Sequence, residues 1–184
     1  MKKNSLIFSA LAGSFILFSS CKKDKVEDPK KNEENEVITT VKIHLTPPGG
    51  GMAMATWKDL TPADAAGQSV DTLRIDSGIV YTGRVELLDE TKNPFVDRSL
   101  EVKKEDYEHL FVFKQEPVTP AFFEVKITDK DKNNLPVGLA FTFEGKKRGV
   151  ATLNVILKHQ PGVKNGSEAP GDSDVDIKFP VKIK

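Results

Sequence analysis

The order of apolar and polar residues changes to a repeat of two at Val37. From there to residue 46, one phase of the segment is apolar or β-branched and the other is mostly polar. The two sets are Val37, Thr39, Val41, Ile43 and Leu45 against Ile38, Thr40, Lys42, His44 and Thr46. Because successive side chains of a strand point to opposite faces, this pattern predicts a half-buried strand. Two prolines and three glycines, residues 47–51, end it.

The last segment of the chain alternates most regularly. Its apolar phase is Val175, Ile177, Phe179, Val181 and Ile183, and its polar phase is Asp174, Asp176, Lys178, Lys182 and Lys184. Further strands are predicted over residues 52–58, 73–75, 79–88, 110–114, 122–128, 137–143 and 151–158, and one helix over residues 99–108. The predicted elements do not alternate between strand and helix, so the sequence gives no indication of a parallel sheet. The series therefore predicts a mainly β fold: a single immunoglobulin-like antiparallel β-sandwich over residues 37–184, with at most one short helix.

The segment before this domain has the pattern of a secretory signal. Lys2 and Lys3 precede an apolar run over residues 6–18, and small residues follow. Such a run fits the ~7–15 residues of a signal peptide, and it is shorter than the ~20 needed to cross a bilayer. We therefore expect residues 1–20 to be a signal peptide.

Cys21 is the single cysteine of the chain and follows that signal directly. It has no second cysteine for an internal disulfide. Leu17-Phe18-Ser19-Ser20-Cys21 resembles a bacterial lipobox, in which the cysteine receives the lipid, although Phe18 replaces the usual leucine. Each buried lipid CH₂ contributes ~0.8 kcal/mol, so several acyl chains on Cys21 would hold the domain on a membrane. An ordinary secretory signal with an incidental cysteine is the alternative.

Residues 22–36, KKDKVEDPKKNEENE, contain one apolar residue, Val26. A segment of this composition cannot bury enough apolar surface to fold, so we expect a disordered tether between lipid and domain. An acidic cluster after a lipidated cysteine can also direct a lipoprotein of the Bacteroidota type to the cell surface. Here Lys22 and Lys23 come first, which fits that signal poorly. The location predicted is the outer membrane, on its periplasmic or cell-surface side.

Charge and motifs restrict the function classes. The chain carries 27 basic and 27 acidic residues, and loss of Lys2 and Lys3 leaves the mature protein weakly acidic. No basic excess would attract nucleic acid. No G-x-S-x-G, H-E-x-x-H, G-x-x-x-x-G-K-[ST] or G-x-G-x-x-G motif occurs. We therefore expect a protein that is not an enzyme and that needs no cofactor.

Two of the three histidines are candidate metal ligands. His109 is in phase with Phe111 and Phe113 at the start of a predicted strand, and His159 is in phase with Leu157 at the end of another. Histidines at such strand ends can meet at one end of a sandwich, where a carboxylate would complete a metal site. Partly buried histidines without a metal are the alternative. His44 lies on the polar face of its strand, and Asp172, Asp174 and Asp176 are expected to point into solvent.

Asp129, Asp131 and Asn133 have the D-x-D-x-N spacing that begins a calcium loop. Asn134 stands where such a loop needs glycine, and no acidic residue follows at its end. A tight connection between two strands explains the same residues, because Asp and Asn favour turns. Both interpretations stay open at this point.

Five segments together resemble a known family. They are Glu36 to Val41, Tyr81 to Glu90, Glu108-His109, Asn134 to Leu139 and Leu157 to Pro161. They are similar to small lipoproteins of Bacteroidota often labelled "type 1 periplasmic binding fold superfamily", and the resemblance covers residues 36–184. It implies an accessory role in uptake beside outer-membrane TonB-dependent receptors, and it implies no catalytic residue.

Two functions follow as expectations. The first is a non-enzymatic binding or accessory module, anchored to the membrane by lipid and working alongside an outer-membrane transporter. The alternative is a lipoprotein that captures a metal or small ligand through His109 and His159. Histidines within ~5 Å of one another and beside a carboxylate would favour the alternative.

Overall fold

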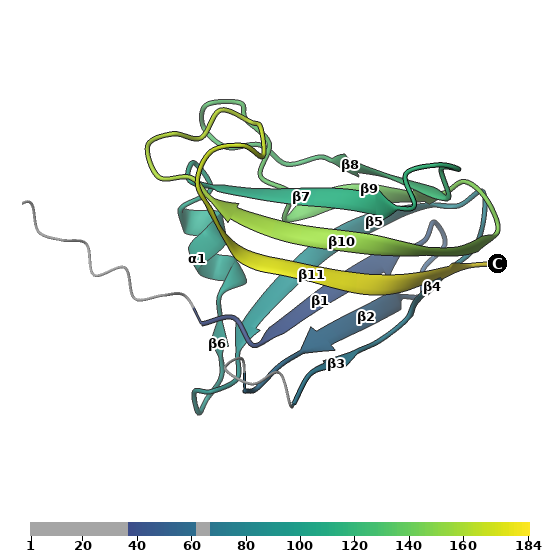
Figure 1. Ribbon diagram of the computed structural model, residues 1–184, viewed down its shortest axis with the longest axis horizontal. Helices are drawn as coiled ribbons and strands as arrows, with labels where there is room; N and C mark the ends of the chain where they lie inside the picture. Colours follow the sequence, from purple (N-terminus) through teal and green to yellow (C-terminus); the bar gives the residue numbers. More distant parts are fainter. Residues whose placement is uncertain (1–36, 62–66) are drawn as a thin grey trace, which may run out of the picture. The chain divides into compact units, whose positions relative to one another are not determined.

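The computed structural model describes residues 37–61 and 67–184, which belong to one compact unit. Two sheets and one short helix make up this part (Figure 1). The expected signal peptide, Cys21 and the tether lie outside the described residues. Among the described residues, no helix has the length and apolarity needed to cross a membrane.

The larger sheet has the order β3-β2-β1-β5-β9-β8, and β6 pairs with β5 beside this path. Every pairing in it is antiparallel. Its strands are β1 (Thr40–Thr46), β2 (Ala53–Lys58), β3 (Ser69–Val70), β5 (Val80–Asp89), β6 (Val96–Asp97), β8 (Phe123–Ile127) and β9 (Ala140–Gly145).

The smaller sheet has the order β4-β11-β10-β7. Its strands are β4 (Leu73–Ile75), β7 (His109–Glu116), β10 (Gly149–His159) and β11 (Asp172–Ile183). β10 pairs antiparallel with β7 and β11, but β11 runs parallel to β4, with Val181 opposite Leu73. The expectation of a wholly antiparallel fold is therefore wrong at this pairing. A repeat of two reports which face is apolar and carries no information on strand direction.

Both sheets contribute to one apolar core. β1 supplies Val41, Ile43 and Leu45, and β11 supplies its whole apolar phase, from Val175 to Ile183. The largest fully buried side chains are Phe111, Phe141, Phe143 and Phe179. The face assignments read from the alternation of these two strands are confirmed.

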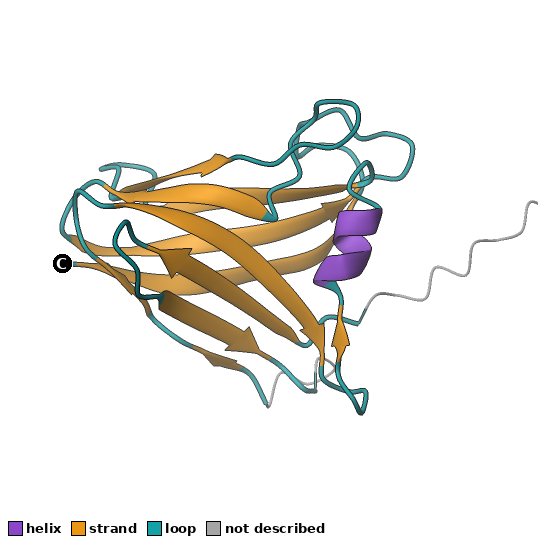
Figure 2. Ribbon diagram, turned by 180° about the vertical axis from the view of Figure 1, so that it is seen from behind, coloured by secondary structure: helices purple, strands orange, loops and turns teal. Residues whose placement is uncertain are grey.

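The helix α1 (Ser99–Lys104) is shorter than the predicted 99–108. Figure 2 shows it at the end of the strands, between β6 and β7. Glu105 has already left helical geometry, and its carbonyl accepts hydrogen bonds from the backbone N–H of Glu108 and from the side chain of His109. These contacts turn the chain into β7. The helix therefore ends at Lys104, although the helical pattern of the sequence continues to residue 108.

The strand predicted over 137–143 begins three residues later, at Ala140. Asp129 accounts for the difference, because its carboxylate accepts the backbone N–H of Gly138 and of Ala140. Gly138 also has a positive φ of 94°, which an extended strand does not use. The two-residue strands β3 and β6 were not predicted.

Candidate functional site

The candidate site lies at one end of the smaller sheet, where β7 begins, β10 ends and β11 begins. His109 and His159 are direct partners across the β7–β10 ladder. Their rings stack with centroids 4.8 Å apart and planes within 5°. The structure thus brings together the two histidines that the strand phases placed at strand ends.

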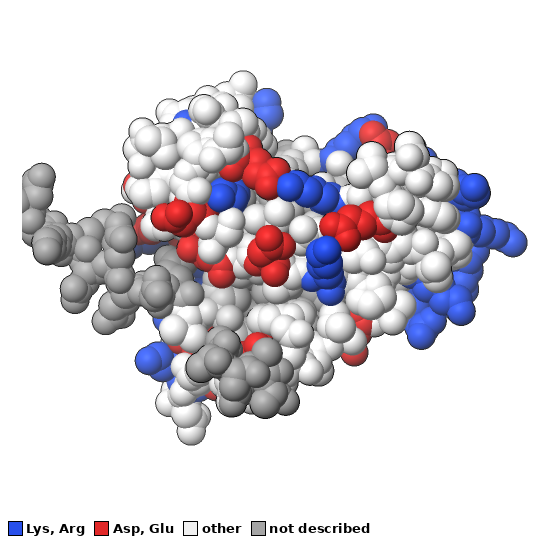
Figure 3. All heavy atoms as spheres, in the orientation of Figure 1, with Lys and Arg blue, Asp and Glu red and all other residues white. Residues whose placement is uncertain are grey.

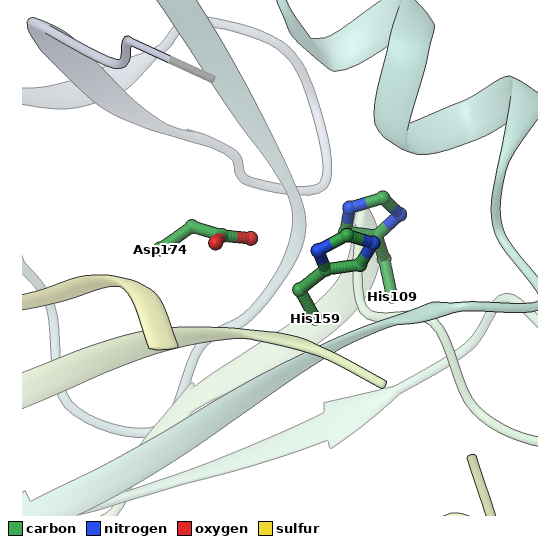
Figure 4. A group of neighbouring side chains, drawn as sticks. All are labelled: His109, His159 and Asp174. Carbon is green, nitrogen blue, oxygen red and sulfur yellow. The ribbon is translucent and has the colours of Figure 1, made fainter. Parts of the chain in front are cut away.

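A bulge in β11 adds Asp174 to this pair. Leu157 lies opposite Val175, but the next residue, Lys158, lies opposite Ser173, so Asp174 has no partner in the ladder. An extra residue of this kind bends the strand and redirects its side chain. The carboxylate of Asp174 points toward the stacked rings (Figure 4). One ligand atom from each of His109, His159 and Asp174 lies within 4.8 Å of the other two.

The sequence placed Asp174 in solvent with Asp172 and Asp176, and this interpretation was incomplete. Asp174 is exposed, yet it faces the histidines. The sequence pattern gave no indication that Asp174 faces the histidines, because strict alternation assigns Asp174 and Asp176 to the same outward face. Only the register of β10 against β11 reveals the extra residue.

The tautomer of His109 is fixed by its surroundings. Its Nδ1 lies 3.0 Å from the carbonyl oxygen of Glu105. A carbonyl only accepts, so Nδ1 carries the proton and Nε2 presents a lone pair. His109 is fully buried, and its Nε2 has no hydrogen-bond partner among the described residues. A buried polar atom of this kind is costly to leave unpaired.

His159 is oriented from its other side by Glu108. The Oε2 of Glu108 lies 3.7 Å from His159 Nε2, and both side chains are largely shielded from solvent. A carboxylate on one ring nitrogen and a free lone pair on the other is the arrangement found around metal-binding histidines. Glu108 therefore favours the tautomer in which His159 Nδ1 can act as a ligand.

Hydrogen bonds and close packing hold the loop between β10 and β11 in place beside the site. Gln160 is fully buried, and its side chain donates to the carbonyls of Ser167 and Pro170, which fixes the loop that leads into β11. Gly171 follows with a φ of 77°, and a Cβ at this position would lie 2.1 Å from the carbonyl oxygen of His159. Only glycine fits there, so β11 enters beside His159 in the register that yields the bulge at Asp174.

Asp174 keeps contact with solvent, but partial burial of its carboxyl raises the pKa of Asp174 above its ordinary value, whereas His159 and His109 act in the opposite direction. Placing a cation beside this carboxylate would favour its charged form. The outward side chains of β11 pass from Asp174 and Asp176 to Lys178 and Lys182. Figure 3 shows basic side chains gathered at the end with the C terminus, whereas acidic and basic side chains are interspersed over the rest of this face.

The D-x-D-x-N residues lie in the connection from β8 to β9. Three of the four carboxylate oxygens of Asp129 and Asp131 accept hydrogen bonds from backbone N–H groups. The fourth, Oδ2 of Asp131, contacts Lys164 Nζ at 2.9 Å. Asn134 adopts a positive φ of 64°, as residues in tight turns do. A calcium ion at Asp129, Asp131 and Asn133 would have to displace these donors, so the loop has the properties of the tight-connection alternative.

Comparison of the chain with protein-family models, with curated proteins and with solved structures found no match.

Proposed function

We propose that this protein is a lipid-anchored, non-enzymatic lipoprotein of the bacterial outer membrane that captures a divalent transition-metal ion through His109, His159 and Asp174. The observation that carries the proposal is the buried Nε2 of His109. It presents a lone pair without a hydrogen-bond partner among the described residues, beside a second histidine and a carboxylate. Two imidazoles and one carboxylate form a donor set suited to Zn²⁺.

The donors are close together, and binding an ion requires them to rotate. Metal–ligand distances of ~2.0–2.2 Å in a tetrahedral arrangement separate the ligand atoms by ~3.3–3.5 Å. The three donors lie within 4.8 Å of one another, and the stacked rings must turn out of their parallel arrangement to direct both lone pairs at one ion. Three protein ligands leave one position for water or for a donor from a partner.

The fold supports a role in presentation and capture. We propose that the two sheets form an immunoglobulin-like sandwich, because their inner faces share one core of apolar side chains. The metal-binding end is then one end of the sandwich, and the tether of residues 22–36 gives it reach from the membrane. Delivery to an outer-membrane transporter beside it agrees with the family resemblance of the sequence.

Zinc titration tests the metal site. The soluble domain, meaning residues 37–184 without the signal and tether, is expected to bind one Zn²⁺ in competition with a chromophoric chelator, and Co²⁺ is expected to give visible d–d bands at the same site. Loss of a group that merely supports a ligand costs ~10–100-fold in affinity, so H159Q and D174N should each weaken binding by more than ~100-fold. Thermal melts of both variants show whether the fold is intact.

Asp176→Asn provides the matched control for Asp174→Asn. It removes one acidic charge from the same strand, two residues away, at an exposed position outside the cluster. Its Zn²⁺ affinity is expected to lie within ~3-fold of the wild type, because exposed charges act weakly through solvent. Equal losses in D174N and D176N would mean that zinc responds only to general negative charge, and the proposed site would be wrong.

Membrane fractionation tests the anchor. Cys21→Ser is expected to move the mature protein from the membrane to the soluble fraction, because the acyl chains supply the membrane affinity. Mass spectrometry of the wild type should show the added lipid mass. A serine variant that still sediments with membranes, together with a wild type without acyl mass, would contradict the proposed localisation without affecting the metal site.

A further inference from the structure

We propose that His44, Met52 and Met54 form a second metal site, distinct from the His109 site, that binds a soft monovalent cation, Cu(I). The site lies on the outer face of the larger sheet, where β1 ends and β2 begins. It is independent of the proposed zinc capture, because none of its residues belongs to the His109 cluster.

Strand pairing and one side-chain contact bring the three side chains together. His44 and Met54 are direct partners across the β1–β2 ladder. Met52 comes just before β2, and its sulfur contacts the His44 ring. Val41, Ile43 and Leu45 occupy the opposite, core-facing side of β1. The three residues thus meet on the side of the sheet that faces away from the core.

A direct contact joins the nitrogen and sulfur donors. His44 Nδ1 lies 3.5 Å from Met52 Sδ. Bonds of ~2.0 Å to nitrogen and ~2.3 Å to sulfur, with an angle of ~120° at the metal, separate the two donors by ~3.7 Å. The pair is therefore already spaced for a three-coordinate ion. Met54, with its flexible thioether, is the third donor.

Glu86 prepares His44 as a ligand. Its Oε2 lies 2.8 Å from His44 Nε2, and an ionised carboxylate only accepts, so Nε2 carries the proton and Nδ1 faces Met52 with a lone pair. Lys42 Nζ holds the other oxygen of Glu86 at 3.0 Å. This carboxylate–histidine arrangement is the usual support for a metal-binding imidazole. Burial, followed by Arg84, lowers the pKa of His44 below its ordinary value, which favours the neutral ring that a metal requires.

Arg84 is the group that a cation would replace. Its Nη2 lies 3.3 Å from His44 Nδ1, and its Nη1 lies 3.4 Å from Glu86 Oε2. The Arg84 side chain is 56% exposed, so it can turn into solvent when an ion binds Nδ1. The lone pair of His44 is thus covered by an exposed side chain that an incoming ion can displace.

The methionines are placed for binding from solvent. Met52 and Met54 are 62% and 49% exposed, so an ion can reach them from solvent. They are the only methionines of the chain apart from Met1. Thioethers are soft ligands that select Cu(I) over the harder divalent ions. The donor set therefore separates this site from the His109 site by metal type.

Titration with Ag(I), a redox-stable substitute for Cu(I), and with Cu(I) against a colorimetric chelator tests the proposal in the soluble domain. One ion is expected to bind in the wild type and in H159Q. The M52L/M54L variant keeps the side-chain volume and should lose more than ~100-fold in affinity. E86Q should lose ~10–100-fold, because it weakens the support of the imidazole.

X-ray absorption of the Cu(I)-loaded protein provides the second readout. Cu–S scattering at ~2.3 Å is expected in the wild type and is expected to disappear in M52L/M54L. The proposal is overturned by no binding, by M52L/M54L affinity within ~3-fold of the wild type, by scattering from nitrogen and oxygen alone, or by loss of binding in H159Q. Thermal melts separate a lost ligand from a lost fold, and zinc capture at His109 can succeed or fail independently.

Discussion

Replacement of Lys164 with alanine is expected to lower the free energy of unfolding by about 3–5 kcal/mol. Lys164 Nζ contacts Asp131 Oδ2 at 2.9 Å, and it donates to the carbonyl of Asp106 at 2.7 Å. The side chains of Lys164 and Asp131 are 2% and 0% exposed. Removing the ammonium leaves a buried carboxylate without its counter-ion, which costs far more than loss of an exposed pair. Urea melts measure the change.

Lys130→Ala is the matched control. Lys130 is exposed and lies next to Asp131 in the connection from β8 to β9, and its Nζ bonds the side chain of Asn134 at 2.9 Å. A change of less than ~0.5 kcal/mol is expected. If Lys130→Ala and Lys164→Ala destabilise the protein equally, the buried pair does not hold this loop.

The Lys164–Asp131 pair also makes the free energy of unfolding depend on pH under acidic conditions. Burial alone would raise the pKa of Asp131, but Lys164 and the backbone N–H groups of Leu135 and Asn133 hold it below its ordinary value. A carboxyl with a lowered pKa stabilises the folded state above its unfolded pKa of about 3.9. This contribution is lost as the pH falls through the lower folded value. Lys164→Ala should therefore show a smaller loss of stability on acidification below about pH 4 than the wild type.

Phe179→Ala is expected to cost a comparable ~3–5 kcal/mol. Phe179 is fully buried in the core shared by both sheets and lies opposite Leu153 in the β10–β11 ladder. A loss of this size is a large part of the ~5–15 kcal/mol that stabilises a typical domain. The expected result in urea melts is a strongly reduced midpoint with an unchanged slope.

Lys178→Ala tests the alternation directly, because Lys178 is the neighbouring residue on the opposite face. Its side chain is exposed and contacts Glu116 at 2.9 Å. Exposed ion pairs contribute ~0.2–1 kcal/mol, so the change should stay below ~1 kcal/mol. Small and equal effects at residues 178 and 179 would contradict the placement of β11 in the core.

The apolar phase of the longer strands was readable from the sequence, because burial on one face requires alternation. Val41 and Phe179 are core residues for this reason, and His109 and His159 followed their strands to the same end. The parallel pairing of β11 with β4 was not readable, since alternation is the same in either direction. The helix end at Lys104 depends on contacts of Glu105 with residues beyond the helix, which periodicity does not contain.

Only part of the candidate site could be predicted from the sequence, for the same reason. Strand phase gave the two histidines, but Asp174 joins them through a bulge that breaks the phase of β11. His44 and the two methionines were missed because their relation lies between strands: Met54 faces His44 only once the β1–β2 register is known. A Met-x-Met sequence that begins eight residues after a histidine on a strand is the sequence signal that could have drawn notice.

Anomalous diffraction at the zinc edge, from crystals of the soluble domain grown with Zn²⁺, tests the central claim most directly. We predict one strong peak at ~2.0–2.2 Å from His109 Nε2, a ring nitrogen of His159 and a carboxylate oxygen of Asp174. The peak should be absent from crystals of H159Q grown under the same conditions. A wild-type structure with zinc elsewhere, or with the stacked histidines unchanged and no peak between them and Asp174, would contradict the assignment of this cluster as a metal site.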